Sequence, residues 1–363
     1  MVKLTITCAL LASSVAALGP GVPGDQASSM FRADRAIDDL VTQALSQHSI
    51  PGMSIALVEN GRVVYAKGFG TTSLSEVRRP SADTQYRLGS VSKPITAVGV
   101  FQLVRAGTVR LDAPAREYCP ELAQLNGAAT VRQFLMHRTG MRHTTDSEDL
   151  NIKGAFPRLG AALERIVQEP LRFPPGTKTL YTSWGYAALG CVIEGASGLS
   201  YTDFIRRRVL EPAGMNSTTF DDPAYTSDTF SPGFRRGTIY GLRPSLVVDT
   251  RFKTPASGII STANDLARFA IAVFDGRLVT DAAAKDMFSV TPDSDGRAVF
   301  TAGWTIDSTR SLFEYNGSME GATAYLEIVP AQRYALAILA NRERCVPQVL
   351  PIAREVRRLV RSD

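Results

Sequence analysis

Segments with the composition of β-strands occur near both ends of the chain, and their placement limits the folds that are possible. Near the start, two apolar-rich runs, 53–59 and 62–69, flank the dipeptide Asn60-Gly61. Asn-Gly between two such runs predicts a tight hairpin, because both central residues of the turn take a positive φ. Near the end, 322–329 and 334–340 also have strand-like sequences. We therefore expect one antiparallel sheet to which both ends of the chain contribute.

Helical periodicity predicts most of the remaining elements. Apolar residues at helical spacing indicate three helices, over 28–49, about 90–106 and 346–360. From about 112 to 250, short helical patterns alternate with Pro- and Gly-rich loops. These patterns predict an α+β fold in which helices flank the sheet and a mostly helical lobe is inserted. The α/β lobe should comprise about 28–111 and 251–363 and the helical lobe about 112–250, with a cleft between them.

Residues 1–18 have the composition and the order of regions that are typical of a secretory signal peptide. Lys3 precedes an apolar run, and small residues then lead into Gly19-Pro20-Gly21. The mature protein should therefore be secreted or periplasmic. No other apolar run approaches the roughly 18 residues of a membrane span, so we expect no stable span after the signal is removed. The remaining cysteines allow at most one disulfide and leave one thiol free: Cys119, Cys191 and Cys345.

Charge and motif content argue against several functional classes. The net charge is +5 over 363 residues, and the densest basic cluster, 206–208, is typical of a solvated helix face, so a nucleic-acid partner is not expected. Three histidines without His-Glu-x-x-His or Cys-x-x-Cys spacing argue against a metal site. Gly-x-Ser-x-Gly, Gly-x-Gly-x-x-Gly and phosphate-loop motifs are absent. An enzyme with this sequence should work without a metal, a cofactor or a catalytic histidine.

One nucleophile motif remains, Ser90-Val-Ser-Lys93, at the start of the second predicted helix. Pro94 is tolerated only in a first turn, so Ser90 and Lys93 should lie on that turn and on one face. A serine needs a nearby base, and a lysine can be that base only where burial or a neighbouring charge lowers its pKa. Alone the motif is weak, because Ser-x-x-Lys arises by chance and serines are ordinary helix caps.

Further segments, in order along the chain, make the motif more specific. Besides 86–97, which contains Ser90, the segments are 130–141, 174–186 with Tyr181-Thr-Ser183, 255–267, and 316–321. In this order they resemble the motifs of the serine β-lactamase-like and penicillin-binding-protein family, which includes class C β-lactamases, D-alanyl-D-alanine peptidases and related esterases. The resemblance implies a β-lactamase/transpeptidase-like fold over a catalytic domain of 28–363. It also implies a serine hydrolase that forms an acyl-enzyme and needs no cofactor.

The resemblance assigns roles to the residues at matching positions. Ser90 would be the acylated nucleophile, and Lys93 the neighbour that accepts or orients its proton. Tyr181 would pass protons between the nucleophile, the leaving group and water, and Ser183 would contact the substrate. The third motif would supply the rest: the Ser318 N–H, which completes an oxyanion hole with the Ser90 N–H, and the substrate-binding residues Tyr315 and Gly317.

The third motif departs from the family pattern. The usual sequence is Lys-Thr-Gly or His-x-Gly, and here it is Tyr315-Asn316-Gly317. A phenol titrates near about 10 and carries no positive charge at neutral pH. We therefore expect a preference for neutral esters or amides over substrates that carry a carboxylate there, such as penicillins.

Two functional hypotheses follow. The intact Ser90, Lys93 and Tyr181 favour an exported serine hydrolase of the esterase or D-peptidase type, acting on a small molecule or a peptide. The altered third motif favours the alternative, a catalytically weak relative that serves as a binding or scaffold module. In that case Tyr181 is a buried aromatic residue and Ser183 the cap of the following helix. We expect His137 to be structural.

Overall fold

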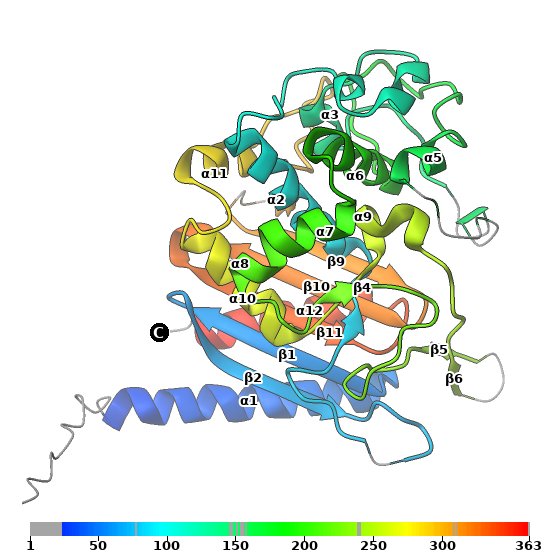
Figure 1. Cartoon of the computed structure of the whole chain (residues 1–363). Helices are drawn as coiled ribbons and strands as arrows, with labels where there is room; N and C mark the ends of the chain where they lie inside the picture. Colours follow the sequence, from blue (N-terminus) through cyan, green and yellow to red (C-terminus); the bar gives the residue numbers. More distant parts are fainter. Residues whose placement is uncertain are drawn as a thin grey trace, which may run out of the picture.

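A six-stranded antiparallel sheet forms the centre of the structure (Figure 1). The structure is a computed structural model, and it describes residues 24–361 apart from 77, 145–147, 150, 151, 153–155, 157, 238–240, 308 and 310. The strand order of the sheet is β2-β1-β11-β10-β9-β8. The strands are β1 Gly52–Glu59, β2 Arg62–Gly70, β8 Thr305–Ile306, β9 Phe313–Met319, β10 Ala322–Val329 and β11 Tyr334–Ala340. β1 pairs with β11, which confirms the α+β class and the sheet built from both ends of the chain.

The first two strands form the predicted hairpin. Asn60 and Gly61 have φ angles of 50° and 75°, so the turn twists in the same sense as the strands. β10 and β11 are buried at every position, whereas the edge strand β2 exposes most of its residues. Helices cover both faces of the sheet, which explains why the central strands are apolar almost throughout.

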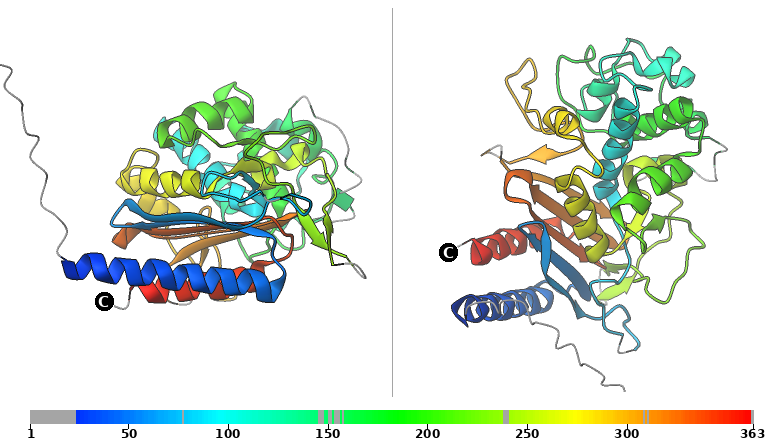
Figure 2. Two further views of the ribbon diagram at one scale, coloured as in Figure 1. Left: turned by 90° about the horizontal axis from the view of Figure 1, so that it is seen from below. Right: turned by 60° about the vertical axis from the view of Figure 1, so that its left-hand side comes forward.

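Two terminal helices cover one face of the sheet. α1, Gly24–His48, and α12, Val346–Val360, pack side by side beneath it (Figure 2). Their bounds confirm the helices predicted over 28–49 and 346–360. The buried residues of α12 recur every three or four positions and so share one face: Val349, Ile352, Ala353 and Val356. On the opposite face of the sheet, α10, Ala263–Phe274, contacts β1 and β11.

The chain between β2 and β8 contains the other helices and two small sheets. Besides α10, the helices are α2 Ser92–Arg105, α3 Val131–Leu135, α5 Leu159–Leu163, α6 Ser183–Ser197, α7 Tyr201–Ile205, α8 Glu211–Ala213, α9 Thr254–Ser257 and α11 Asp281–Met287. The small sheets comprise β3 Tyr86–Arg87, β7 Ile259–Ser261 and β4 Thr219–Phe220, and the pair β5 Phe234–Arg236 and β6 Leu242–Pro244. Among the helices, α2, α6 and α9 pack against one another.

The long helix starts two residues later than predicted. α2 begins at Ser92, and Ser90 belongs to a preceding 3-10 turn, Gly89–Val91. Gly89 has a φ of 51°, outside the right-handed helical region, so an α-helix cannot extend back through it. Ser90 and Lys93 nevertheless remain about one turn apart. Pro94 occupies the first turn, where its missing N–H costs no helical hydrogen bond.

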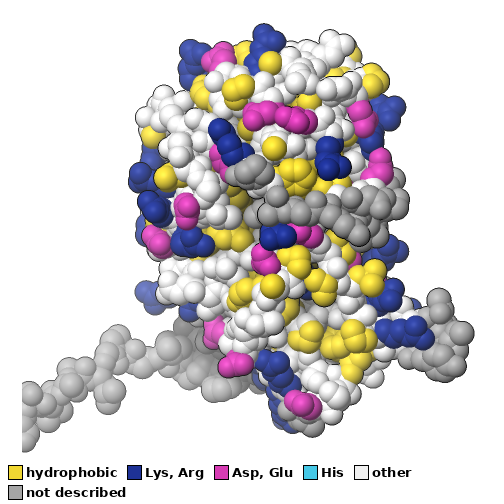
Figure 3. All heavy atoms as spheres, turned by 45° about the vertical axis from the view of Figure 1, so that its right-hand side comes forward, with side chains coloured by type: hydrophobic (Ala, Val, Ile, Leu, Met, Phe, Trp, Pro, Cys, Tyr) yellow, Lys and Arg dark blue, Asp and Glu magenta, His cyan; other side chains and the backbone are white. Residues whose placement is uncertain are grey.

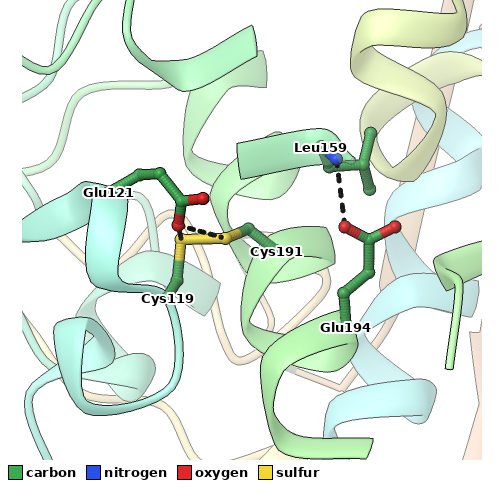
Figure 4. Close-up of a disulfide and its surroundings, with 5 residues drawn as sticks. All are labelled: Cys119, Glu121, Leu159, Cys191 and Glu194. Carbon is green, nitrogen blue, oxygen red and sulfur yellow. Dashed lines mark hydrogen bonds between the residues drawn. A yellow bond between two sulfur atoms is a disulfide. The ribbon is translucent and has the colours of Figure 1, made fainter. Parts of the chain in front are cut away.

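A disulfide joins Cys119 to Cys191 of α6, and Cys345 is a buried free thiol. This agrees with the expectation of at most one bridge and one free thiol. The bonded residues are 72 positions apart, so the bridge connects the segment after α2 to the helix that begins at Ser183. Glu121 lies beside both sulfur atoms (Figure 4), but sulfurs bonded to each other cannot serve as thiolate ligands for a metal ion.

The predicted signal peptide, 1–18, lies outside the described residues. Within the part of the chain that the structure describes, no helix has both the length and the apolar sequence needed to cross a membrane. The predicted boundaries between an α/β lobe and a helical lobe stay a proposal about domain organisation.

Candidate active site

Ser90 and Lys93 lie next to each other at the start of α2. The Lys93 side chain is fully buried, and its Nζ lies 3.0 Å from Ser90 Oγ. The same nitrogen donates to the Ala256 carbonyl oxygen at 3.0 Å and to Ser183 Oγ at 3.4 Å. Three acceptors therefore surround Lys93, and they match the three N–H donors of a lysine ammonium group.

Tyr181 reaches the same serine hydroxyl from the loop before α6. Its Oη lies 2.6 Å from Ser90 Oγ. Thr182 caps α6 by accepting a hydrogen bond from a backbone N–H of the first turn, so Ser183 is not the helix cap. Ser183 is instead the first residue of α6, and its hydroxyl contacts Lys93. The fold thus joins four of the side chains singled out in the sequence into one hydrogen-bonded group.

The lysine and the phenol shift each other's pKa. Burial lowers the pKa of Lys93, and this effect outweighs the opposite effect of Tyr181. Burial by itself raises the pKa of Tyr181, but the charge of Lys93 and hydrogen bonds with Lys93, Ser90 and Ser183 outweigh it, so the pKa lies below its usual value. Because both shifts are towards neutral pH, the pair is suited to moving a proton.

Two glycines let β9 approach the turn that carries Ser90. A Cβ on Gly317 would lie 2.0 Å from the Leu88 carbonyl oxygen and 2.9 Å from the Ser90 nitrogen, so only glycine fits there. A Cβ on Gly89 would lie 3.1 Å from the Ser318 nitrogen. The backbones at Ser90 and Ser318 are therefore adjacent, which is the arrangement that two donors to one oxyanion require.

Tyr315, at the position where the family pattern has a cation, is buried beside His137. The Tyr315 hydroxyl lies 3.1 Å from His137 Nε2, and burial raises the pKa of Tyr315 well above its usual value, an effect that the neighbouring Tyr181 reinforces. Burial, reinforced by the charge of Lys93, holds the pKa of His137 well below its usual value, so the ring is neutral. The Thr182 N–H donates to His137 Nδ1, which leaves the ring proton on Nε2, directed at Tyr315. The neutral pair of His137 and Tyr315 therefore stands where the family pattern has a cation.

A cleft of about 650 Å³ contains these groups. Its lining includes five of the residues predicted from the sequence: Ser90, Tyr181, Ser183, Tyr315 and Ser318. Lys93 is fully buried and contacts Ser90 and Ser183 of the lining, and Gly317 is buried in β9. The structure therefore gathers every predicted site residue around one cleft.

Other residues of the cleft were assigned no role from the sequence. The Ser183 N–H donates to His143 Nδ1 at 3.4 Å. Ser257 Oγ is buried and has no hydrogen-bond partner among the described residues. Lys253 forms an ion pair with Asp149, and its charge further lowers the pKa of Lys93. Ser257 lies within the family segment 255–267, but no role was assigned to any of these side chains, because only their position along the cleft gives them significance.

Almost the whole described chain matches a single family. A family model described as Beta-lactamase matches residues 37–358. The chain belongs to the beta-lactamase family. This confirms the resemblance seen in the sequence and the β-lactamase/transpeptidase-like fold.

Individual members of the beta-lactamase family are distant in sequence. Protein flp of Staphylococcus aureus is 25% identical over 316 residues, which are 84% of this chain and 62% of that protein, so this chain spans less than two thirds of its relative. An octameric penicillin-binding protein homologue from Pyrococcus abyssi has a TM-score of 0.78 at 24% identity, over 90% of this chain and 76% of that chain. D-amino acid amidase from Ochrobactrum anthropi has a TM-score of 0.78 at 22% identity, over 91% and 99%. These structures support the fold.

Proposed function

We propose that this beta-lactamase family member is a serine hydrolase that cleaves an ester or an amide through an acyl-enzyme on Ser90, of the esterase or D-peptidase type. One observation carries the proposal: Ser90 Oγ lies in the cleft, 2.6 Å from Tyr181 Oη and 3.0 Å from Lys93 Nζ. A hydroxyl held against two proton-handling groups is an activated nucleophile. The shared fold with a D-amino acid amidase is consistent with amides as one substrate class.

The reaction takes place in two stages. Ser90 Oγ attacks the carbonyl carbon while its proton passes to Tyr181, and the N–H groups of Ser90 and Ser318 hold the oxyanion. The bond to the alcohol or amine then breaks, and Tyr181 returns the proton to that leaving group. Water next attacks the acyl group, giving a proton to Tyr181. The acid departs, and the proton returns to Ser90 Oγ.

Tyr181, rather than Lys93, is the base in this proposal. The three acceptors around Lys93 Nζ suit an ammonium group, which has no lone pair to accept a proton. The pKa of Tyr181 is lowered from its usual value mainly by the Lys93 charge acting against burial, so a phenolate is accessible. Lys93 therefore acts by stabilising the phenolate and orienting Ser90.

The protein is proposed to act outside the cytoplasm, with 1–18 as its signal peptide. The disulfide between Cys119 and Cys191 supports this, because disulfides persist in oxidising compartments. Export predicts that the purified protein from a periplasmic or secreted fraction begins after residue 18. A mature protein that retains Met1 would contradict export.

The decisive experiment is covalent labelling. A fluorophosphonate should add one group to the wild-type protein and none to Ser90→Ala, as measured by intact mass. Ser92→Ala is the matched control, since Ser92 lies on the same stretch of chain and its hydroxyl accepts a hydrogen bond from the Ile259 N–H instead of contacting Tyr181. Folded wild-type protein that takes no label, and cleaves neither a neutral ester nor an amide, would support the binding or scaffold alternative.

Substrate charge gives a second test. Because Tyr315 is uncharged, the wild-type protein should hydrolyse a neutral p-nitrophenyl ester more efficiently than nitrocefin, which carries a carboxylate beside the reacting bond. The ratio of the two kcat/KM values measures this preference. Nitrocefin turnover that equals or exceeds ester turnover would contradict it.

Tyr315→Phe should move the pH dependence of ester hydrolysis. Tyr181 accepts a proton only when it is ionised, so kcat/KM rises with pH through its pKa. Losing the Tyr315 hydroxyl removes a polar neighbour of the phenolate and raises that pKa, which shifts the rising limb to higher pH. The pH–rate profile measures the shift, and the exposed neighbour variant Asn316→Ala serves as the control. An unchanged or more acidic limb in Tyr315→Phe would contradict this role of Tyr315.

A further inference from the structure

The β5–β6 hairpin forms one end of the cleft. The Phe234 N–H donates to the Asn341 carbonyl oxygen at 2.8 Å, which anchors the hairpin beyond β11. The hairpin also contacts the β9–β10 turn, since a Cβ on Gly321 would lie 2.4 Å from Gly233 Cα. It therefore lies past the end of β9, the strand that contains Ser318. Figure 3 views this side of the molecule, where hydrophobic side chains gather beside basic ones.

Arg235 of this hairpin lines the same cleft as Ser90. Its Nε is buried and has no hydrogen-bond partner among the described residues. Glu343, which also lines the cleft, accepts hydrogen bonds from Ser245 Oγ at 2.9 Å and from the Gly321 N–H at 3.1 Å, and so holds the rim together. A buried donor without an acceptor costs free energy, and an acceptor on a bound ligand removes that cost.

The facing strand places a second positive charge nearby. Arg235 is paired with Arg243, and directly opposite residues of an antiparallel pair share one face. Like charges in this arrangement destabilise the hairpin, whereas an anion beside them is attracted by both. The charged residues that line the cleft balance, with Arg235, Lys253 and Arg344 against Asp149, Glu320 and Glu343, so a singly charged carboxylate is accommodated more easily than a phosphate dianion.

We propose that Arg235 binds a carboxylate at the end of the substrate remote from the bond that is cleaved. Leu246 and Val248 also line the cleft, and Leu246 is 49% exposed, so they can pack against an apolar chain that runs from Ser90 towards Arg235. The inference rests on the proposed function and adds a substrate class, the esters or amides of acids whose chain ends in a second carboxylate. Tyr315 still requires the reacting end to be neutral.

The test uses p-nitrophenyl monoesters of linear dicarboxylic acids of increasing length, each paired with the same compound methylated at the far carboxyl group. At one chain length, the wild-type protein should show a kcat/KM about 10- to 100-fold higher for the free carboxylate, as expected for a charged hydrogen bond. Arg235→Gln should abolish this preference by lowering kcat/KM for the free carboxylate to about that for the methylated compound. Arg235→Lys keeps the positive charge but loses the planar guanidinium group, which can donate two hydrogen bonds to one carboxylate. This variant should therefore retain part of the preference.

Arg236→Gln is the matched control, since Arg236 is exposed and neighbouring residues of a strand point to opposite faces. It should retain the full preference. A wild-type protein with no preference at any chain length, or an Arg235→Gln variant that slows both compounds equally, would overturn the proposal.

Binding without turnover separates this inference from the proposed function. Calorimetry with monomethyl suberate, which is neutral at one end, and the Ser90→Ala protein requires no ester cleavage. The comparison is between the Ser90→Ala protein and the Ser90→Ala/Arg235→Gln protein. Binding that is about tenfold or more weaker in the double variant supports the carboxylate site, whether or not Ser90 is the nucleophile. Equal binding by the two proteins rejects the site while leaving the proposed function intact.

Discussion

Tyr181→Phe is expected to lower kcat/KM for a neutral p-nitrophenyl ester by about 1,000-fold, within the range for loss of a general base. Phe keeps the ring that packs against His137, with 4.7 Å between centroids, but removes the hydroxyl that lies 2.6 Å from Ser90 Oγ. Ser90 then has only the Lys93 ammonium group beside it, and an ammonium cannot accept the proton. Steady-state kinetics, with circular dichroism to verify folding, measure the effect.

A second buried tyrosine offers a matched control. Lys93 Nζ lies 5.7 Å from the ring centroid of Tyr186, yet the Tyr186 hydroxyl donates to the Leu135 carbonyl oxygen at 2.9 Å and does not reach Ser90. Tyr186→Phe should therefore keep most of the activity. If Tyr181→Phe also retained nearly wild-type activity, Tyr181 would not be the base, and Lys93 would have to take that role.

Removing the disulfide is expected to lower the free energy of unfolding by about 4 kcal/mol. The bridge closes a loop of 72 residues, and a cross-link of that length restricts the unfolded chain by about this amount. The loss corresponds to about a 1,000-fold change in the folding equilibrium. Urea unfolding of the Cys119→Ala/Cys191→Ala protein, compared with the oxidised wild-type protein, measures it.

A reductant provides the control for this comparison. It should destabilise the wild-type protein towards the level of the double variant and leave the double variant unchanged, because the remaining Cys345 is unbonded. A double variant with the urea midpoint of the oxidised wild-type protein would show that the bridge contributes nothing to stability.

Local sequence was sufficient to predict the elements that frame the fold. The Asn60-Gly61 hairpin, the strands over 322–329 and 334–340, and the helix over 346–360 are present with nearly the predicted bounds. Each depends on turn chemistry or on a period that repeats over adjacent residues.

The prediction of secondary structure from sequence failed where contacts with a neighbouring backbone segment decide the conformation against the local sequence pattern. β9 has no clear strand signal, because Asn316, Gly317 and Ser318 interrupt the apolar residues; its pairing with β10 makes it a strand. Similarly, the sequence indicated an α-helix starting at Ser90, whereas the positive φ of Gly89 delays its start to Ser92. That φ accompanies the close approach of Gly89 to the Ser318 backbone.

By itself, the sequence determined the main elements near both ends of the chain, the family resemblance and the pairing of Ser90 with Lys93, since residues three positions apart meet on any helical turn. Only the tertiary structure decided that Tyr181, 91 positions from Ser90, shares its hydrogen bond, and that His137 meets Tyr315 across 178 positions. Such contacts form because burial of the whole core brings distant segments together, and a hydrogen bond is made only where packing leaves two polar groups within reach of each other. For the same reason, an arginine with no motif around it, Arg235, could be connected with the cleft only after folding.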